Sequence, residues 1–408
     1  MPSLTQHRDL HGGRSPWQFT RAPLPARSVL RDDRHCDVLV VGAGISGALV
    51  ADALSDSGMH VLICDRRHPL QGSTLASTAM VLYETDLPLQ RLIARLGRRD
   101  AERIWRRSFM AARALRERAR RLGIDADVEE HDTLYLQGDL LDAHGLRREA
   151  EARARAGFDV GYLAADKVRQ RYGILRRAAL QACGATSANP RALAAGFLRA
   201  AARRGAELLT PEEVTGIRAR AAGVRARTRS GHWIHARQLV FATGYELPRE
   251  VPARGHRIVS TWAIATPPQR RAPWPGPSLI WEASKSYLYL RTTPEGRVLC
   301  GGGDEDIADA TRRDALLARK AAWLQRRLSA LLPSVDARVD FAWSGSFGAA
   351  TDGLPTIGPV PGLPRCYAVL GYGGNGITFS MLAAQMLRNL LSGGNEPDLD
   401  LVRFRARR

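Results

Sequence analysis

Runs of apolar residues that end in glycine turns are the clearest pattern along the chain. Residues 36–67 give an apolar strand, a glycine turn, an amphipathic helix and a second apolar strand, which predicts a βαβ unit. Strands that pair in parallel are buried on both faces, which explains their unbroken apolar character. An apolar strand also enters a glycine turn at residues 238–246, and residues 366–394 repeat the order strand, turn and helix.

The remaining segments predict a mixture of short strands and helices. A narrow apolar stripe within residues 87–122 indicates one arginine-rich helical stretch with a charged outer side. Residues 257–303 are rich in strand-like segments, which suggests a separate antiparallel sheet. Further strands are predicted at 133–137, 207–209, 214–218, 224–228 and 233–236, helices at 141–156, 192–204 and 310–331, and an irregular arm at 1–35 anchored by Trp17 and Phe19.

Composition narrows the class of protein. The 408 residues are 45% hydrophobic and 25% charged, which excludes a mainly disordered or fibrous chain. No window approaches 18 consecutive apolar residues, so no membrane span is expected, and the polar, basic N-terminus predicts a cytoplasmic protein. Five scattered cysteines and ten histidines without ligand spacing predict neither a disulfide framework nor a metal site.

The net charge of +19 leaves two interpretations open. Lysine and arginine total 60, and because only Lys167, Lys285 and Lys320 are lysines, arginine supplies nearly all of the positive charge. The arginines are spread over most predicted helices, which favours a solvated basic surface over a nucleic-acid groove. Either surface attracts anionic ligands moderately.

The turn at Gly42-x-Gly44-x-x-Gly47 predicts a dinucleotide site. The first glycine permits the tight turn, the second lets a pyrophosphate approach the backbone, and the third allows close packing of helix and strand. Asp65 ends the second strand 23 residues after Gly42, where a carboxylate can accept from ribose hydroxyls. This pattern alone does not separate FAD from NAD.

Three later segments favour FAD. Residues 71–80 offer hydroxyls for phosphate and ribitol, and Thr243–Gly244 adds a second turn near the same phosphates. A glycine-rich helix start at 371–378 suits the negative N1–O2 edge of a reduced flavin, because a helix N-terminus favours anions. An NAD-dependent dehydrogenase has no evident use for that second helix.

Taken together, these motifs resemble the D-amino-acid oxidase-like FAD-dependent oxidoreductases, which include glycine and sarcosine oxidases, D-amino-acid dehydrogenases and γ-glutamylputrescine oxidase. The resemblance rests on VVGAGISG, Asp65, GSTLASTA, ATG, DGLPTIG and GYGGNGITFS, and covers about residues 36–390. It implies an α/β fold, α+β overall, in which a Rossmann-like FAD-binding domain (1–127, 189–248, 343–408) is interrupted by an antiparallel-sheet substrate domain (128–188, 249–342). It also implies oxidation of a C–N bond of an amine or amino acid by hydride transfer to flavin N5, after which the imine is hydrolysed.

The resemblance also assigns cofactor-binding positions. They are Gly42, Gly44, Ile45, Ser46 and Gly47 for the pyrophosphate, Asp65, Arg66, Arg67 and Val214 for the adenosine, Gly72, Ser73, Thr74, Ser77, Thr78, Thr243 and Gly244 for phosphates and ribitol, and Gly373, Asn375, Gly376, Ile377 and Thr378 for the flavin. Amino-acid oxidases of this kind often carry arginine where this chain has Phe347, and sarcosine-oxidase-like members often have lysine where it has Thr378. Two carboxylate anchors are therefore missing. The flavin-linking cysteine is also missing, which predicts non-covalent FAD.

The substrate side has several candidates, each with a structural alternative. Tyr287, Tyr289 and Arg291 alternate on one face of a predicted strand, where the tyrosines would enclose an amine and Arg291 would bind an anion, or where the three would stack on a surface. Tyr83 and Glu84 would reach the flavin, with Glu84 attracting an amine or capping a helix. Catalytic candidates are thus Tyr83, Glu84, Tyr289, Arg291 and Thr378, and Lys285 is either an aid to oxygen reduction or an exposed lysine.

The expected partners are a small amine or amino acid and an oxygen or quinone acceptor. Two alternatives remain at this point. One is an NAD-dependent dehydrogenase that shares only the first βαβ unit. The other, prompted by the positive charge, is a flavoprotein that acts on nucleic acid, for example on modified tRNA bases.

Overall fold

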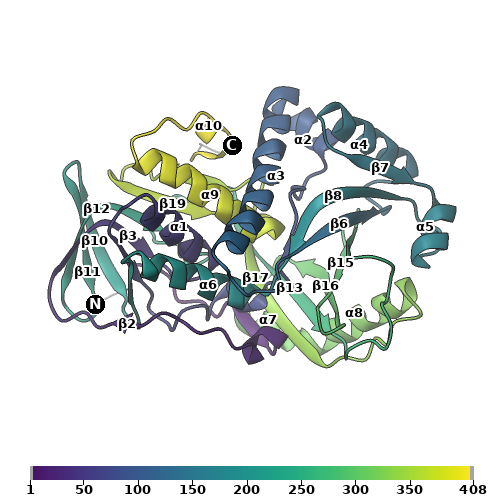
Figure 1. Ribbon diagram of the computed structural model, residues 1–408, viewed down its shortest axis with the longest axis horizontal. Helices are drawn as coiled ribbons and strands as arrows, with labels where there is room; N and C mark the ends of the chain where they lie inside the picture. The colour runs from purple at the N-terminus through teal and green to yellow at the C-terminus, as the bar shows by residue number, and fades with distance from the viewer. Residues whose placement is uncertain (1–2, 405–408) are drawn as a thin grey trace.

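The computed structural model describes residues 3–404, and two β-sheets lie side by side in it (Figure 1). The predicted domain limits also include residues 1–2 and 405–408, which lie outside the described residues. The first sheet has the order β10 (Val214–Arg220), β11 (Gly223–Thr228), β12 (Trp233–Phe241), β3 (Arg34–Val41), β4 (Val61–Cys64), β9 (Glu207–Leu209) and β2 (Arg27–Ser28). Beside β12 it continues with β19 (Cys366–Leu370), which pairs with β18 (Thr356–Pro359).

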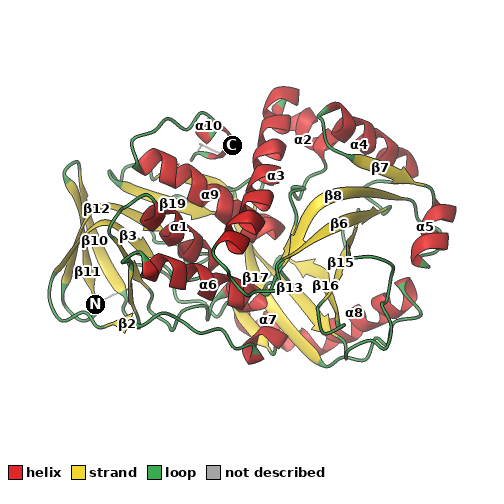
Figure 2. Cartoon of the chain, in the orientation of Figure 1, coloured by secondary structure: helices red, strands yellow, loops and turns green. Residues whose placement is uncertain are grey.

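The first sheet is built on β3, whose apolar residues are buried on both faces. Val38 and Val40 belong to the core beneath the helices, whereas Leu39 and Val41 belong to the core on the opposite face. β3 pairs in parallel with both β12 and β4, as its unbroken apolar run predicts. The covering helices are α1 (Ile45–Asp56), α6 (Pro190–Arg203) and α9 (Gly376–Leu391), and α1 packs between the other two (Figure 2).

The second sheet lies to the right in Figure 1 and is largely antiparallel. Its order is β1 (His11–Gly13), β17 (Phe341–Ala350), β13 (His256–Ala265), β16 (Val298–Glu305), β15 (Leu288–Thr292), β14 (Ser278–Glu282), β6 (Glu129–Leu136), β8 (Ala179–Ser187) and β5 (Met80–Val81), with β7 (Val160–Leu163) beside β8. The pair β14–β6 is parallel. Trp262, Leu288 and Leu290 pack with Leu324 and Leu328 of α8 (Leu317–Leu331), which covers one face.

The other helices lie around these two layers. α3 (Arg98–Arg121) packs against both α9 and β8, and so connects the two halves of the molecule. The remaining elements are α2 (Leu89–Leu96), α4 (Ala143–Arg155), α5 (Ala165–Tyr172), α7 (Ala310–Ala315), α10 (Leu399–Val402) and the 3₁₀ turns η1 (Pro16–Phe19), η2 (Ser73–Ala76) and η3 (Gly373–Asn375).

The predicted α/β fold class is confirmed, but several element limits differ. The stretch 87–122 is two helices, because Gly97 adopts φ 81° and both ends α2 and starts α3. The segment 310–331 is likewise divided at Leu316. β17 crosses the predicted domain limit at 342/343, and β1 and β5 pair in the second sheet, so these strands lie on the other side of the predicted limits.

The N-terminal arm, residues 3–20, runs along both sheets. Leu4 is buried in the core of the first sheet, and β1 pairs with β17 at the edge of the second sheet. Trp17 is buried and its indole Nε1 donates to the carbonyl of Ser77 at 2.8 Å. Phe19, predicted as a second anchor, is instead 59% exposed, so Trp17 alone of the two is a buried anchor.

Three classes of feature are not found within residues 3–404. No helix there combines the length and the hydropathy that a membrane crossing needs. No group of three or more histidine, cysteine, aspartate or glutamate side chains in that range is placed to hold a metal ion. No disulfide bond is found there either, since all five cysteines are free; Cys183 is the exposed one among them.

Candidate cofactor and active site

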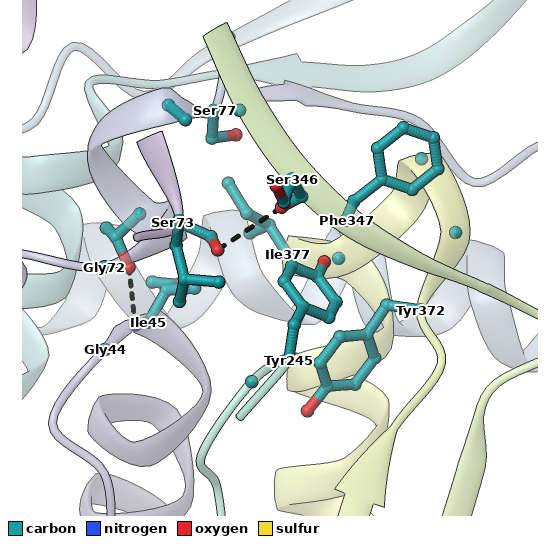
Figure 3. A pocket seen from close by; sticks show the side chains of 18 of the residues that line it. Gly44, Ile45, Gly72, Ser73, Ser77, Tyr245, Ser346, Phe347, Tyr372 and Ile377 are labelled. Atoms are coloured by element: carbon teal, nitrogen blue, oxygen red, sulfur yellow. Dashed lines mark hydrogen bonds between the residues drawn. The ribbon is translucent and has the colours of Figure 1, made fainter. Parts of the chain in front are cut away.

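A cavity of about 610 Å³ lies between the two sheets, a volume within the usual range for small-molecule sites. Residues of both sheets line it, from the turn after β3 to strands β13, β15 and β16. Figure 3 shows part of its wall, with Tyr245, Tyr372 and Phe347 on one side and Gly44 and Gly72 on another. The cavity therefore joins the predicted dinucleotide turn to the second sheet.

The glycine turn after β3 has the conformation that the sequence predicts. Gly42 has φ 111°, and a Cβ at this position would lie 2.4 Å from the carbonyl oxygen of Ala242. A Cβ on Gly47 would lie 1.8 Å from the carbonyl oxygen of Gly42, so only glycine lets α1 approach the strand this closely. Gly44 precedes α1 without a side-chain cap, and the positive end of the helix dipole faces the cavity.

Asp65 connects that turn to the loop after β4. Its Oδ2 accepts from the backbone N–H of Ala43 at 2.7 Å, and its Oδ1 accepts from that of Arg67 at 2.9 Å. Burial raises the pKa of the Asp65 carboxyl, and these two donors partly offset the rise. Asp65 lines the cavity, and a carboxylate has acceptor capacity beyond these two bonds, so contact with ribose hydroxyls stays a prediction.

Arg66 and Arg67 line the cavity beside Asp65 and form ion pairs with Glu246. Arg66 contacts Glu246 Oε1, and Arg67 places two nitrogens 2.6 and 2.7 Å from the Glu246 oxygens. The N-terminal arm joins the same cluster, since the backbone N–H of Arg8 donates to Glu246 Oε1 at 2.6 Å. Thr5 and Leu10 of the arm also line the cavity. The arm thus forms part of the cavity wall next to Asp65.

The segment 72–78 supplies a wall of small polar residues. Thr74 Oγ1 accepts the backbone N–H of Ile45 at 3.1 Å, which satisfies one donor of the first turn of α1. Ser73 Oγ donates to the carbonyl of Ser346 at 3.4 Å, the contact drawn in Figure 3. Ser77 Oγ accepts from the backbone N–H of Ala79 at 3.0 Å, which shapes the end of the segment.

The glycine-rich start of α9 forms the opposite wall, and an aspartate holds it in place. Asp86 accepts from the backbone N–H of Gly374 at 3.2 Å and from Asn375 Nδ2 at 3.4 Å. Gly373 has φ 57°, and a Cβ there would lie 1.9 Å from Asp86 Oδ2, so another residue would strain the backbone and displace the Asp86 side chain. Burial among protein atoms raises the pKa of Asp86 to about 6, although its carboxylate is open to the cavity.

A sequence comparison identifies the family. The profile of the family described as FAD dependent oxidoreductase (DAO) matches residues 37–390. The chain belongs to this family. The resemblance stated from the motifs, the fold class and the expectation of an FAD-dependent oxidoreductase are therefore confirmed. An NAD-dependent dehydrogenase that shares only the first βαβ unit does not account for a match of this length.

The chain is similar to several distantly related proteins. It is 25% identical to the tRNA 5-methylaminomethyl-2-thiouridine biosynthesis bifunctional protein MnmC of Ralstonia nicotianae, over 97% of this chain and 63% of that protein. It is 23% identical to the gamma-glutamylputrescine oxidoreductase of Escherichia coli, over 90% and 86% of the two chains. The crystal structure of glycine oxidase from Geobacillus kaustophilus has the same fold, with a TM-score of 0.72 at 22% identity, over 89% and 96% of the chains.

The cavity fits FAD by observations independent of the family. Thr243 Oγ1 is a buried oxygen without a hydrogen-bond partner in the described structure, and Thr243 lines the cavity. The glycine turns at Gly42 and Gly373 bring backbone within reach of a ligand at both ends. Buried polar atoms ordinarily have partners, so the Thr243 hydroxyl is suited to a ligand oxygen.

Most predicted cofactor positions line this one cavity. These are Gly42, Gly44, Ile45, Ser46, Asp65, Arg66, Arg67, Gly72, Ser73, Thr74, Ser77, Thr78, Val214, Thr243, Gly244, Gly373, Asn375, Gly376 and Ile377. Gly47 and Thr378 are not among the lining residues; Gly47 faces the turn backbone, and Thr378 Oγ1 donates to the carbonyl of Leu82 at 2.7 Å. Their individual contacts with FAD remain predictions.

The structure places three of the catalytic candidates, Tyr83, Arg291 and Thr378, outside the described cavity wall. Tyr83 is 1% exposed, outside the cavity wall, and packs against Trp105 and Phe158. Arg291 turns away from the cavity and donates to the carbonyls of Thr78 at 2.6 Å and Ala188 at 2.8 Å. Thr378 is buried against the backbone of Leu82, as described above.

The other two catalytic candidates, Glu84 and Tyr289, both lie at the cavity wall. Glu84 is fully buried at the cavity wall, accepts from Thr133 Oγ1 at 2.9 Å, and lies 3.6 Å from Arg153 Nη1. These contacts engage its Oε1, whereas its buried Oε2 has no hydrogen-bond partner in the described structure, so a role of Glu84 in attracting an amine stays a prediction. Tyr289 lines the cavity as predicted, beside Tyr287, with the two ring centroids 5.9 Å apart.

Several lining residues were not found from the sequence. Asp304, Asp86 and Tyr245 all line the cavity and come from different segments. A partial signal existed for Asp86, which follows Tyr83 and Glu84 closely, and for Asp304, which follows three glycines. Neither pattern alone shows which side chains meet.

Proposed function

We propose that the protein oxidises a C–N bond of a small amine. Bound FAD supplies a two-electron acceptor that takes a hydride from the carbon next to nitrogen. The nitrogen loses a proton, the C–N single bond becomes C=N, and water then hydrolyses the imine to a carbonyl compound and ammonia or a smaller amine. This assignment extends the family membership to a substrate class.

The observation that carries the proposal is the charge of the cavity beyond the glycine turn. The arginines among its described lining residues are Arg66, Arg67 and Arg257, and each is ion-paired with a carboxylate, Glu246 for the first two and Asp306 for the third. Phe347 lines the cavity at the position where related amino-acid oxidases often have arginine. A substrate carboxylate thus meets no unpaired guanidinium among these arginines, and Lys285 is the one lysine among the described lining residues. Asp86 and the tyrosines suit an amine.

This chain's own residues orient the reaction. Thr74, Ser73 and the turn at Gly42 would hold the cofactor phosphates, and Asn375 and Ile377 would lie along the flavin. The start of α9 is fixed by Asp86 and by the bond of Asn375 Nδ2 to the carbonyl of Glu84 at 2.8 Å. We expect FAD to be non-covalent. Relatives with covalent flavin carry the linking cysteine just before the DGLP segment, whereas Cys64, the cysteine on the described cavity wall, lies next to Asp65.

The test is an absorbance spectrum of the purified protein, repeated without oxygen after addition of amines and amino acids. Flavin bands that an amine bleaches support the proposal, and bands that amino acids alone bleach contradict the amine class. Reoxidation by air or by a quinone then identifies the acceptor, which we propose to be one of these two. Fractionation of source cells tests the proposed cytoplasmic location.

A second candidate is a flavoprotein that acts on tRNA. Two observations favour it, the alignment of nearly the whole chain with MnmC and the net charge of +19. The chain spans 63% of the length of that relative, so the relative's activity is not transferred with the likeness. Specific tRNA binding that survives moderate salt, with bleaching of the flavin by tRNA, would favour this candidate over a small amine.

A further inference from the structure

A carboxylate on the second sheet faces the cavity and lacks a direct cationic partner. Asp304, at the end of β16, accepts from the Tyr287 hydroxyl through Oδ2 at 2.7 Å. Its Oδ1 is buried without a hydrogen bond of good geometry, and the Thr261 hydroxyl is a polar neighbour that favours the charged form. Burial outweighs this help and raises the pKa of Asp304.

The cation on α8 that acts on Asp304, Lys320, is already engaged. Lys320 Nζ lies 2.6 Å from Glu305 Oε1 and donates to the carbonyl of Gly303 at 2.5 Å. Its charge lowers the pKa of Asp304 without an ion pair between the two. Leaving a buried acceptor without a hydrogen bond costs free energy. A hydrogen-bond donor on a ligand in the cavity would therefore bind favourably to the Asp304 carboxylate.

A second carboxylate shares the same space. Asp86 is fixed to the start of α9, where the flavin is expected, whereas Asp304 lies on the wall made by the second sheet. Both carboxylates line the cavity, and besides burial, the negative charge of Asp304 raises the pKa of Asp86. Tyr245, Tyr287 and Tyr289 line the cavity with them, and aromatic faces attract cations.

We propose that the substrate carries two basic nitrogens joined by a short apolar chain, and that Asp304 binds the nitrogen that is not oxidised. This inference rests on the proposed amine oxidation and specifies its substrate class. The nitrogen at Asp304 keeps its proton and positive charge, and its N–H groups donate to Oδ1. The other nitrogen, near Asp86, loses its proton, and its neighbouring carbon then loses the hydride.

Two other substrate classes fit less well. A monoamine would leave the Asp304 carboxylate without a partner. An amino acid would bring a third negative charge between Asp86 and Asp304, and like charges repel strongly where water is scarce. The diamine class is the one that satisfies both carboxylates at once.

The experiment compares 1,4-diaminobutane, n-butylamine and glycine as reductants of the holoenzyme without oxygen, and measures binding of the first two by calorimetry. In the wild type, the diamine should bind about ten- to a hundredfold more tightly than the monoamine, as expected for a hydrogen-bonded charge. In Asp304→Asn this preference should disappear, because the amide carries no negative charge to pair with the second nitrogen. Glu295→Gln, which removes an exposed charge from the β15–β16 turn outside the cavity wall, is the matched control and should keep the preference.

Each outcome supports or overturns either the role of Asp304 or the substrate class. Equal affinity of the wild type for the two amines, or an unchanged preference in Asp304→Asn, overturns the assignment of Asp304. If no amine bleaches the flavin, the proposed function fails, and calorimetry still shows whether the cavity selects a dication through Asp304. If Asp304→Asn does not retain FAD, the wild-type comparison of the two amines alone decides whether the substrate class stands.

Discussion

At the scale of single residues, Thr74 shows how a cavity residue also stabilises the fold. Its hydroxyl accepts the backbone N–H of Ile45 in the first turn of α1. Thr74→Val removes this acceptor while keeping the shape, and should lower the free energy of unfolding by about 1 kcal/mol. Urea unfolding measures the change, with Thr74→Ser as the variant that keeps the hydroxyl. Equal losses in both variants would show that the hydroxyl is not responsible.

Asp86 predicts a pH dependence whose sign can be stated. Its pKa is raised from 3.8 to about 6, chiefly by burial. A carboxyl with a raised pKa in the folded chain stabilises the fold when protonated, and this contribution is lost as the pH rises through about 6. Asp86→Asn has no charge to bury, so its free energy of unfolding should exceed that of the wild type by about 1 kcal/mol at about pH 7.5. This figure allows for screening by water in the cavity. At about pH 4 the two free energies of unfolding should be almost equal.

Unfolding of both proteins across that range provides the measurement. The difference in stability between variant and wild type should grow between about pH 4 and pH 6 and then level off. Parallel stability curves for the two proteins would contradict the assignment of a raised pKa to Asp86. The asparagine retains an acceptor for the Gly374 N–H, so loss of that bond does not confuse the comparison.

At the scale of elements, the break between α2 and α3 depends on one glycine. Gly97 has φ 81° and ψ 156°, a conformation that side chains other than glycine rarely adopt. A Cβ there would meet no atom within 4 Å, so any cost of Gly97→Ala comes from the backbone alone. We expect a loss of about 1–3 kcal/mol in the free energy of unfolding.

A glycine on β7 provides the matched control for Gly97→Ala. Gly161 also has open space around a Cβ position, but its φ is not in the left-handed region. Gly161→Ala should therefore leave the stability nearly unchanged. Thermal unfolding of both variants tests this, and an equal loss in the two would mean that exposure rather than φ determines the effect.

Sequence patterns predicted the elements whose contacting residues lie close together in the chain. The turn from Gly42 to Gly47 and the carboxylate of Asp65 lie within one βαβ unit, so spacing alone places them together. Alternation correctly put Tyr289 and Arg291 on one face of β15. It did not show that the Arg291 guanidinium would reach the backbone of Thr78 and Ala188 rather than the cavity.

The substrate side depends on distant contacts and was therefore harder to predict. Asp86 meets Gly374 across 288 positions of the chain, and Asp304 belongs to another sheet. Glu84 has the chemistry of an amine-binding group, but Arg153 and Thr133 already contact its carboxylate. Periodicity gives the face of an element, whereas the partner that covers that face depends on the whole topology.

At the scale of the molecule, two buried acids hold the N-terminal arm to the body: Glu213, which contacts Ser3 and His7, and Glu246. Glu246, with a side chain 6% exposed, contacts Arg66, Arg67 and the backbone of Arg8. Glu246→Gln removes the anion that Arg66 and Arg67 share. It should cost about 2–3 kcal/mol, less than a fully buried pair, because Arg67 is 30% exposed and Arg66 keeps Glu213 at 4.0 Å. Trypsin should then cleave at Arg8 and Arg14 about tenfold faster or more.

Glu250→Gln is the control for this experiment, because Glu250 is exposed in the same segment. It should leave the rate of tryptic cleavage in the arm unchanged. The affinity for FAD, measured by flavin fluorescence, should fall in Glu246→Gln and not in the control. Unchanged protease sensitivity in Glu246→Gln would mean that β1 and Leu4 hold the arm without the ion pairs.

The order of the strands also has a consequence for synthesis of the protein. The chain passes repeatedly between the sheets, and β19 and the start of α9 reach the first sheet after every strand of the second has been made. The cavity wall from Gly373 to Ile377 is thus among the last described segments to leave the ribosome. Nascent chains halted before β19 would expose unpaired strand edges and would need chaperones, and a cofactor can be captured only near the end of translation.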